Sequence, residues 1–184
     1  HASIFFIKNN LENRHDIITS FLETLKSVGC IHAKKTIIEK LSFEHVISIL
    51  PYFDAKTLKN ILLIETDQVV QFERIIPLDQ WKNATKYGYC CYPSSTKQLE
   101  HCFHFEEFTI EIDELSVQNA VQIRDDLMKR STFQKCEISF AKSANLIKIA
   151  KVFKSDYAGD IYFKFEYSNN NDTFAIECQS HLWF

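Results

Sequence analysis

The residues best suited to chemistry are cysteines and histidines that gather in one stretch of the chain: Cys90, Cys91, His101, Cys102 and His104. Thiolates and imidazoles are preferred zinc ligands, and a cysteine beside a histidine is also the pair that forms a thiol nucleophile. Adjacent Cys90 and Cys91 would point to opposite faces of a strand, whereas His101 and His104 would share one face of a helix. A zinc- or thiol-dependent enzyme is therefore one hypothesis. Buried thiols and packed histidines are the alternative.

The rest of the sequence does not indicate catalysis. The glycines Gly29, Gly88 and Gly159 are isolated, so they form no glycine-rich phosphate loop. Neither H-E-x-x-H nor G-x-S-x-G occurs. We therefore expect no catalytic residue, no cofactor and no bound metal, and a protein that is not an enzyme.

The composition limits which classes of partner and which cellular compartment are expected for this protein. The 184 residues are 46% hydrophobic, include 16 phenylalanines and carry a formal net charge of -3. Net acidity argues against a nucleic-acid partner, although Tyr87, Tyr89 and Tyr92 are aromatics of the kind that stack on bases. No apolar run is long enough to span a membrane. The cysteines lie mostly in apolar surroundings and are expected to be reduced, which predicts a cytoplasmic or nuclear protein.

Strand-like and helix-like patterns alternate along the chain. Alternating or β-branched apolar residues predict strands, and apolar residues three or four apart predict helices. The predicted strands are 35–41, 57–65, 87–92, 108–113 and 136–140. The predicted helices are 10–29, a segment capped by Ser42, 77–85 with Trp81 facing inward, 96–103, a segment capped by Ser116, and 144–153. Residues 160–167 and 173–178 predict a final hairpin.

The spacing of the strands indicates the architecture. Successive strand centres lie roughly 20–30 residues apart, as in leucine-rich-type repeats where each unit holds one strand and one helix. We predict an α/β fold, a leucine-rich-repeat-like stack of βα units with a mainly parallel sheet, an N-terminal capping helix and a C-terminal β-hairpin. A compact two-layer sheet is the alternative. One domain is expected over 1–184, with its core at about 11–153 and the hairpin at about 158–184.

Two groups of outward-facing strand positions are candidates for binding a partner. Strict alternation puts Glu107, Thr109, Glu111 and Asp113 on the solvent side of their strand, an acidic stripe that would favour a target protein with a basic surface. Leu62 and Ile64 would be exposed aliphatic anchors unless a helix or another layer covers them. The alternative for the acidic stripe is an ordinary solvated sheet face. The predicted partner-binding residues are Leu62, Ile64, Thr109, Glu111 and Glu137.

Six short motifs follow one another in a fixed order. They are ILPYF at 49–53, TLKNI at 57–61, LDQWKNA at 78–84, HCFHFEEF at 101–108, SVQNAVQIRDDL at 116–127 and IAKVF at 149–153. In this order and spacing they resemble the FTH domain of the nematode F-box A protein family, over about Leu11 to Phe153. The departure is Cys102, where the family often has an aromatic residue.

The resemblance implies a non-catalytic recognition domain. Members commonly carry an F-box upstream, which recruits the core of a cullin-type ubiquitin ligase, while this domain is thought to choose the target protein. The resemblance also implies that the histidine-rich motif is a packing element, because Phe103, Phe105 and Phe108 are core-like. No F-box lies within the chain, and the only methionine is Met128, so we expect a piece of a longer protein. An adaptor or inhibitor without an F-box is the alternative.

Overall fold

The chain is described by a computed structural model that covers residues 2–8, 15–66, 72–90, 96–142, 146–158, 162–169 and 172–180. It forms two compact units, His1–Tyr92 and Pro93–Phe184, which are described one at a time. Parts of four predicted elements lie outside the described residues: 10–14, 91–92, 144–145 and 160–161.

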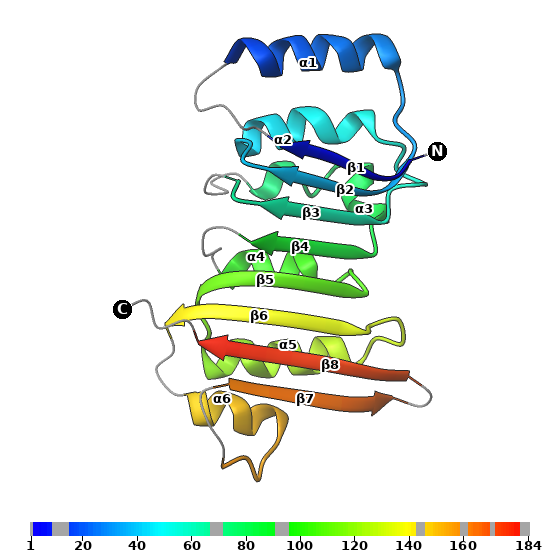
Figure 1. Cartoon of the computed structure of the whole chain (residues 1–184). Coiled ribbons are helices and arrows are strands. Elements are labelled where there is room, and N and C mark those ends of the chain that lie inside the picture. The colour runs from blue at the N-terminus through cyan, green and yellow to red at the C-terminus, as the bar shows by residue number, and fades with distance from the viewer. Residues whose placement is uncertain are drawn as a thin grey trace. The chain divides into compact units, whose positions relative to one another are not determined.

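Unit 1 alternates strands and helices and builds a parallel sheet in the order β1-β2-β3-β4 (Figure 1). Parallel neighbours need a long crossover, which the helices and loops between them provide. Its elements are β1 (Ala2–Lys8), α1 (His15–Val28), β2 (Ala33–Glu39), α2 (Phe43–Ile49), the 3-10 turn η1 (Leu50–Tyr52), β3 (Asn60–Ile64), η2 (Phe72–Arg74), α3 (Asp79–Asn83) and β4 (Lys86–Cys90).

Local signals in the sequence account for several of these boundaries. The Ser42 side chain accepts a hydrogen bond from the His45 backbone and so caps α2, as predicted. Gly29 ends α1 with a left-handed φ of 82°, a conformation that glycine adopts without strain. Lys40 and Glu65 follow β2 and β3 at equivalent positions and also have positive φ, which indicates that the two strand ends are built alike.

The core of unit 1 lies against one face of its sheet. Ile38 of β2, Ile61 and Leu63 of β3 and the α2 residues Val46 and Ile49 are all fully buried. Because alternate residues of a strand face opposite ways, the positions between them form a second, open face.

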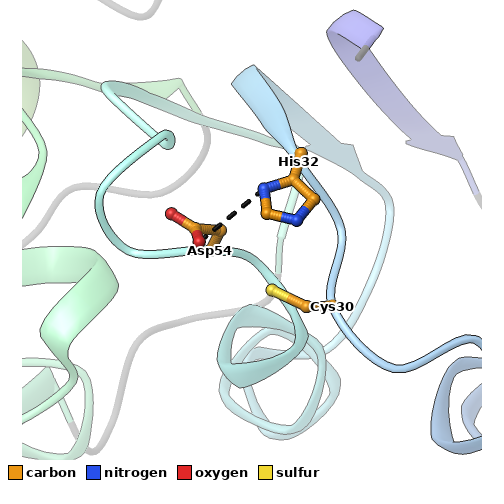
Figure 2. A group of neighbouring side chains, drawn as sticks. All are labelled: Cys30, His32 and Asp54. Carbon is orange, nitrogen blue, oxygen red and sulfur yellow. Dashed lines mark ion pairs between the residues drawn. The ribbon is translucent and has the colours of Figure 1, made fainter.

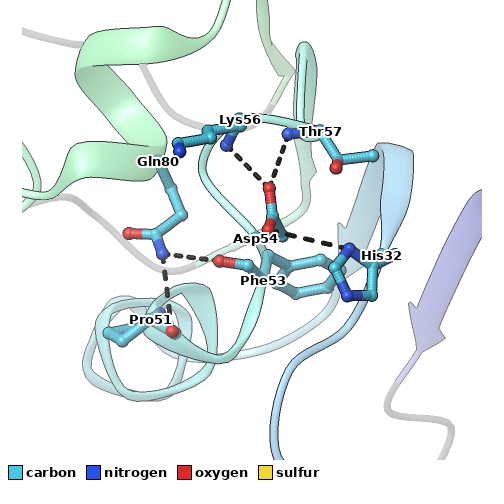
Figure 3. Close-up of polar contacts among 7 residues, drawn as sticks. All are labelled: His32, Pro51, Phe53, Asp54, Lys56, Thr57 and Gln80. Carbon is cyan, nitrogen blue, oxygen red and sulfur yellow. Dashed lines mark hydrogen bonds and ion pairs between the residues drawn. The ribbon is translucent and has the colours of Figure 1, made fainter.

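Two of the motifs meet inside unit 1. Gln80 of α3 donates its side-chain amide to the Phe53 carbonyl at 2.7 Å, which ties the LDQWKNA helix to the end of ILPYF (Figure 3). Trp81 beside it is 1% exposed, as predicted, and packs edge-on against Phe72 and Tyr87. The motifs are therefore packing elements of one core.

Unit 2 repeats the strand–helix alternation and ends in the predicted hairpin. Strands β5, β6 and β8 are parallel neighbours, and β7 pairs antiparallel with β8 (Figure 1). The last strand thus lies between β6 and β7. Its elements are α4 (Thr96–Leu99), η3 (Glu100–Cys102), β5 (Glu107–Glu114), α5 (Val117–Met128), β6 (Lys135–Lys142), α6 (Leu146–Phe153), β7 (Tyr162–Asn169) and β8 (Asp172–Ser180).

The α/β class, the parallel pairing and the succession of βα units are confirmed, and one element differs from the prediction. Strand β1 precedes the predicted first helix and pairs with β2 at the edge of the unit 1 sheet. Residues 4–7 form an unbroken apolar run without alternation, and no strand was predicted there.

Candidate functional site

An exposed apolar row crosses the open face of unit 1. The register aligns Phe6 of β1 with Ile37 of β2, Leu62 of β3 and Gly88 of β4. Phe6 is 54% exposed, and Ile37 and Leu62 are half-buried. A Cβ at Gly88 would lie 2.6 Å from Leu62 Cδ1, so the Leu62 side chain lies over this glycine. We call Phe6, Ile37 and Leu62 the apolar row.

The positions that border the apolar row on both sides along the strands are mostly polar, with one isoleucine in each border. On one side Lys8 forms an ion pair with Glu39 at 2.6 Å, and Ile64 is the next position in that register. On the other side Ile4 aligns with Lys35, and Lys35 with Asn60. An apolar centre with a polar rim is the usual anatomy of a protein-binding surface.

The predicted anchors Leu62 and Ile64 lie on this open face. Both are half-buried, whereas Ile61 and Leu63 between them are fully buried. Each side chain is therefore neither fully exposed nor fully buried, and its role as an anchor stays a prediction. Phe6 and Ile4, which sequence reasoning missed, are more exposed than either and belong to the same face.

The acidic candidates share the open face of unit 2. Thr109 of β5 lies directly opposite Glu137 of β6 and donates its hydroxyl to the Glu137 carboxylate at 3.1 Å. Lys135 forms an ion pair with the other oxygen of Glu137, so this carboxylate is partly neutralised. Glu111 is the next outward residue of β5 and lies opposite Ser139. The predicted alternation is confirmed, since Phe108, Ile110 and Ile112 are buried.

The cysteine–histidine stretch is not assembled for chemistry where the structure describes it. Cys102 is fully buried, and burial raises the pKa of its thiol, which disfavours the thiolate that a ligand or nucleophile needs. His101 and His104 are exposed, and the His104 ring packs on Phe105. Arg130 donates to the carbonyls of His104 and Phe105, which fixes this segment as a packing element. Cys91 lies outside the described residues.

The base-stacking alternative is wrong for two of its three aromatics. Tyr87 and Tyr89 are 3% and 2% exposed, so their ring faces are covered by protein. Tyr92 lies outside the described residues.

A different cluster of metal-ligating residues, missed by sequence reasoning, occurs in unit 1. Cys30, His32 and Asp54 place one ligand atom each within 4.8 Å of the others, and they are the one such group among the described residues (Figure 2). The backbone explains their meeting: Ile31 forms a parallel bridge with Phe53, through hydrogen bonds from Ile31 to Tyr52 and from Asp54 to Ile31. Cys30 and His32 flank the bridged residue, so their side chains leave the same side of the strand.

Asp54 is held in place by the chain that follows it. The backbone N–H groups of Lys56 and Thr57 both donate to Asp54 Oδ1 at 2.8 Å (Figure 3). These hydrogen bonds, first of all those from Thr57, lower the pKa of the Asp54 carboxyl below its ordinary value, because they favour the ionised form. The other oxygen, Oδ2, lies 3.7 Å from His32 Nδ1.

Fold and surfaces together define an α/β protein of successive strand–helix units with open sheet faces. The FTH domain family matches residues 15–156, and the chain belongs to this family. The chain is also 26% identical over 175 residues to F-box A protein 224 of Caenorhabditis elegans, an alignment that covers 94% of this chain and 45% of that protein. It therefore spans less than half the length of this curated relative. No solved structure matches it. Within the described residues, no helix is long and apolar enough to cross a membrane.

Proposed function

We propose that this chain is a protein-interaction domain that selects the target of an F-box-type adaptor for a cullin-type ubiquitin ligase. Membership of the FTH family and the likeness to a protein named as an F-box A protein carry this proposal. The domain acts by surface complementarity, without catalysis or cofactor, in the cytoplasm or nucleus. The F-box that would join it to the ligase core belongs to sequence outside these residues.

The open sheet faces are the proposed contact surfaces. In unit 1 the exposed Phe6 and the half-buried Leu62 and Ile64 offer an apolar centre that a partner can desolvate. In unit 2 Thr109, Glu111 and Glu137 offer an acidic face suited to a basic surface on the target.

A double variant that replaces one apolar anchor and one acidic residue tests these surfaces. The tagged chain is used for pull-down, its binders are identified by mass spectrometry, and the affinity of each purified binder is then measured. Leu62→Asp together with Glu111→Lys is expected to abolish target binding and leave the melting temperature unchanged, because both side chains lie on open faces. Ile147→Asp together with Glu73→Lys is the matched control, since it makes the same kinds of change at exposed positions of α6 and η2. Target binding by the double variant that equals the control would refute the surface assignment.

An adaptor or inhibitor without an F-box remains the second candidate, and the full-length protein distinguishes the two. Co-precipitation of the cullin ligase core with the full-length protein, and its loss when the sequence upstream of this chain is deleted, supports the ligase adaptor. Target binding without any ligase core in the precipitate supports the plain adaptor.

A further inference from the structure

We propose that Cys30, His32 and Asp54 form a zinc-binding site, with a water molecule as the fourth ligand. The site lies at the amino ends of β2 and β3, because Cys30 and His32 precede β2 and Asp54 precedes β3. It is separate from the apolar row and independent of the function proposed above, and it departs from the expectation that the chain binds no metal.

The chemical types of the three ligand atoms indicate which metal the site binds. A thiolate, an imidazole and a carboxylate together are typical of zinc, whereas calcium and magnesium take oxygen ligands. Three protein ligands leave one position of a tetrahedral ion open. Cys30 and His32 are exposed, so that position is open to solvent and takes water.

The distances are close to those of a bound ion. Two nitrogen or oxygen ligands on a tetrahedral zinc lie about 3.3 Å apart, and a sulfur ligand lies about 3.5 Å from either. His32 Nδ1 and Asp54 Oδ2 are 3.7 Å apart, and the whole set lies within 4.8 Å. The remaining contraction of roughly 1 Å falls on exposed side-chain tips, which rotate at little cost.

The surrounding hydrogen bonds prepare Asp54 as a ligand. Oδ1 accepts the N–H groups of Lys56 and Thr57, which orients the carboxylate and leaves Oδ2 directed toward His32 (Figures 2 and 3). Such outer contacts fix the orientation of metal ligands in proteins. The carbonyl of Phe53, the residue before Asp54, accepts a hydrogen bond from the Gln80 side chain.

A bound ion would also join two segments that the backbone already brings together. The Ile31–Phe53 bridge holds the segment before β2 against the segment after η1. Zinc would add a cross-link at this point, and its binding energy would stabilise the folded state of unit 1.

The test is zinc binding by the purified, reduced chain after treatment with a chelator. One equivalent of zinc is expected by competition with a chromophoric indicator, together with a higher melting temperature in the presence of zinc. Cobalt is expected to give a thiolate-to-metal charge-transfer band together with the visible bands of a tetrahedral ion. Cys30→Ser should remove the charge-transfer band. His32→Ala and Asp54→Asn should each weaken zinc binding at least about tenfold.

Controls separate this site from the other thiols and histidines of the chain. His101→Ala removes an exposed histidine from unit 2 and should leave zinc binding unchanged. Asp54→Asn keeps an oxygen that accepts the two backbone N–H groups, so its circular dichroism should match that of the parent. Failure to bind one equivalent, or a charge-transfer band that survives Cys30→Ser, would overturn the proposal.

Discussion

Replacing Gln80 by leucine isolates one buried contact between the LDQWKNA and ILPYF motifs. The Gln80 amide donates to the Phe53 carbonyl at 2.7 Å and makes a longer contact of 3.4 Å with the Pro51 carbonyl. Gln80 is 8% exposed and Phe53 1% exposed. Leucine is close to glutamine in size and in helix propensity, so Gln80→Leu removes the donor without opening a cavity or weakening α3.

The expected loss of folding stability comes from the buried Phe53 carbonyl, which loses its hydrogen-bond donor. A buried acceptor that loses its donor costs about 1–3 kcal/mol, and the 3.4 Å contact adds little. We expect Gln80→Leu to lower the free energy of unfolding by about 2 kcal/mol, which corresponds to a fall of about 4–8 °C in melting temperature. Urea denaturation followed by the fluorescence of Trp81, which is 1% exposed, measures the change in unit 1 when the second tryptophan, Trp183, is replaced by phenylalanine in both parent and variant.

A matched surface substitution makes this result interpretable. Gln122 of α5 donates its amide to the Glu100 carboxylate at 2.9 Å in an exposed position. Gln122→Leu should change stability by less than about 0.5 kcal/mol, since water replaces the lost partner. If Gln80→Leu costs no more than Gln122→Leu, then the Gln80 hydrogen bonds do not stabilise the junction of the two motifs and the reasoning fails.

Three further predictions concern a cap, a glycine and a carboxylate. Ser116→Ala removes the side chain that accepts the Asn119 N–H at 3.1 Å and should cost about 1 kcal/mol in thermal denaturation. Gly88→Ala should be nearly neutral alone, because Leu62 must swing away, but should stabilise by about 0.5–1 kcal/mol in a Leu62→Ala background, as a double-mutant cycle would show. The lowered pKa of Asp54 contributes stability above the ordinary value of 3.8 that is lost as the pH falls through the folded-state pKa. The stability difference between the parent and Asp54→Asn, measured by urea titration, should therefore shrink as the pH falls below 3.8.

Local patterns predicted much of the fold because they depend on neighbours in sequence. The alternation in β5 predicted which of its residues are buried, and Ser116 and Ser42 predicted two helix starts, since a cap acts within three residues of itself. The face of α5 was less well predicted. Its apolar residues do not all face the core: Val117 and Met128 are 38% and 42% exposed, whereas Ala120, Ile123 and Leu127 are buried.

Strand β1 was missed for a physical reason of another kind. Its outward residues Ile4 and Phe6 are apolar and exposed, so the strand lacks the polar and apolar alternation that marks a half-buried strand. The same feature makes β1 part of the proposed contact surface. Exposed apolar residues at a protein-binding surface break the polar and apolar alternation by which strands are recognised. Strands at such a surface are therefore the ones most readily missed in a sequence.

The zinc cluster depends on a contact that no local pattern records. Cys30 and His32 are separated by one residue and form a recognisable ligand pair, but Asp54 joins them only because the Ile31–Phe53 bridge aligns two distant segments. That bridge requires β2 and β3 to be parallel neighbours, so the cluster follows from the topology of unit 1. The stretch richest in cysteine and histidine was the stronger signal in the sequence, yet its Cys102 is buried in a packing motif. Cysteines and histidines that are close in sequence do not by themselves make a metal site. Metal binding requires that their side chains leave the same side of the backbone and meet in space.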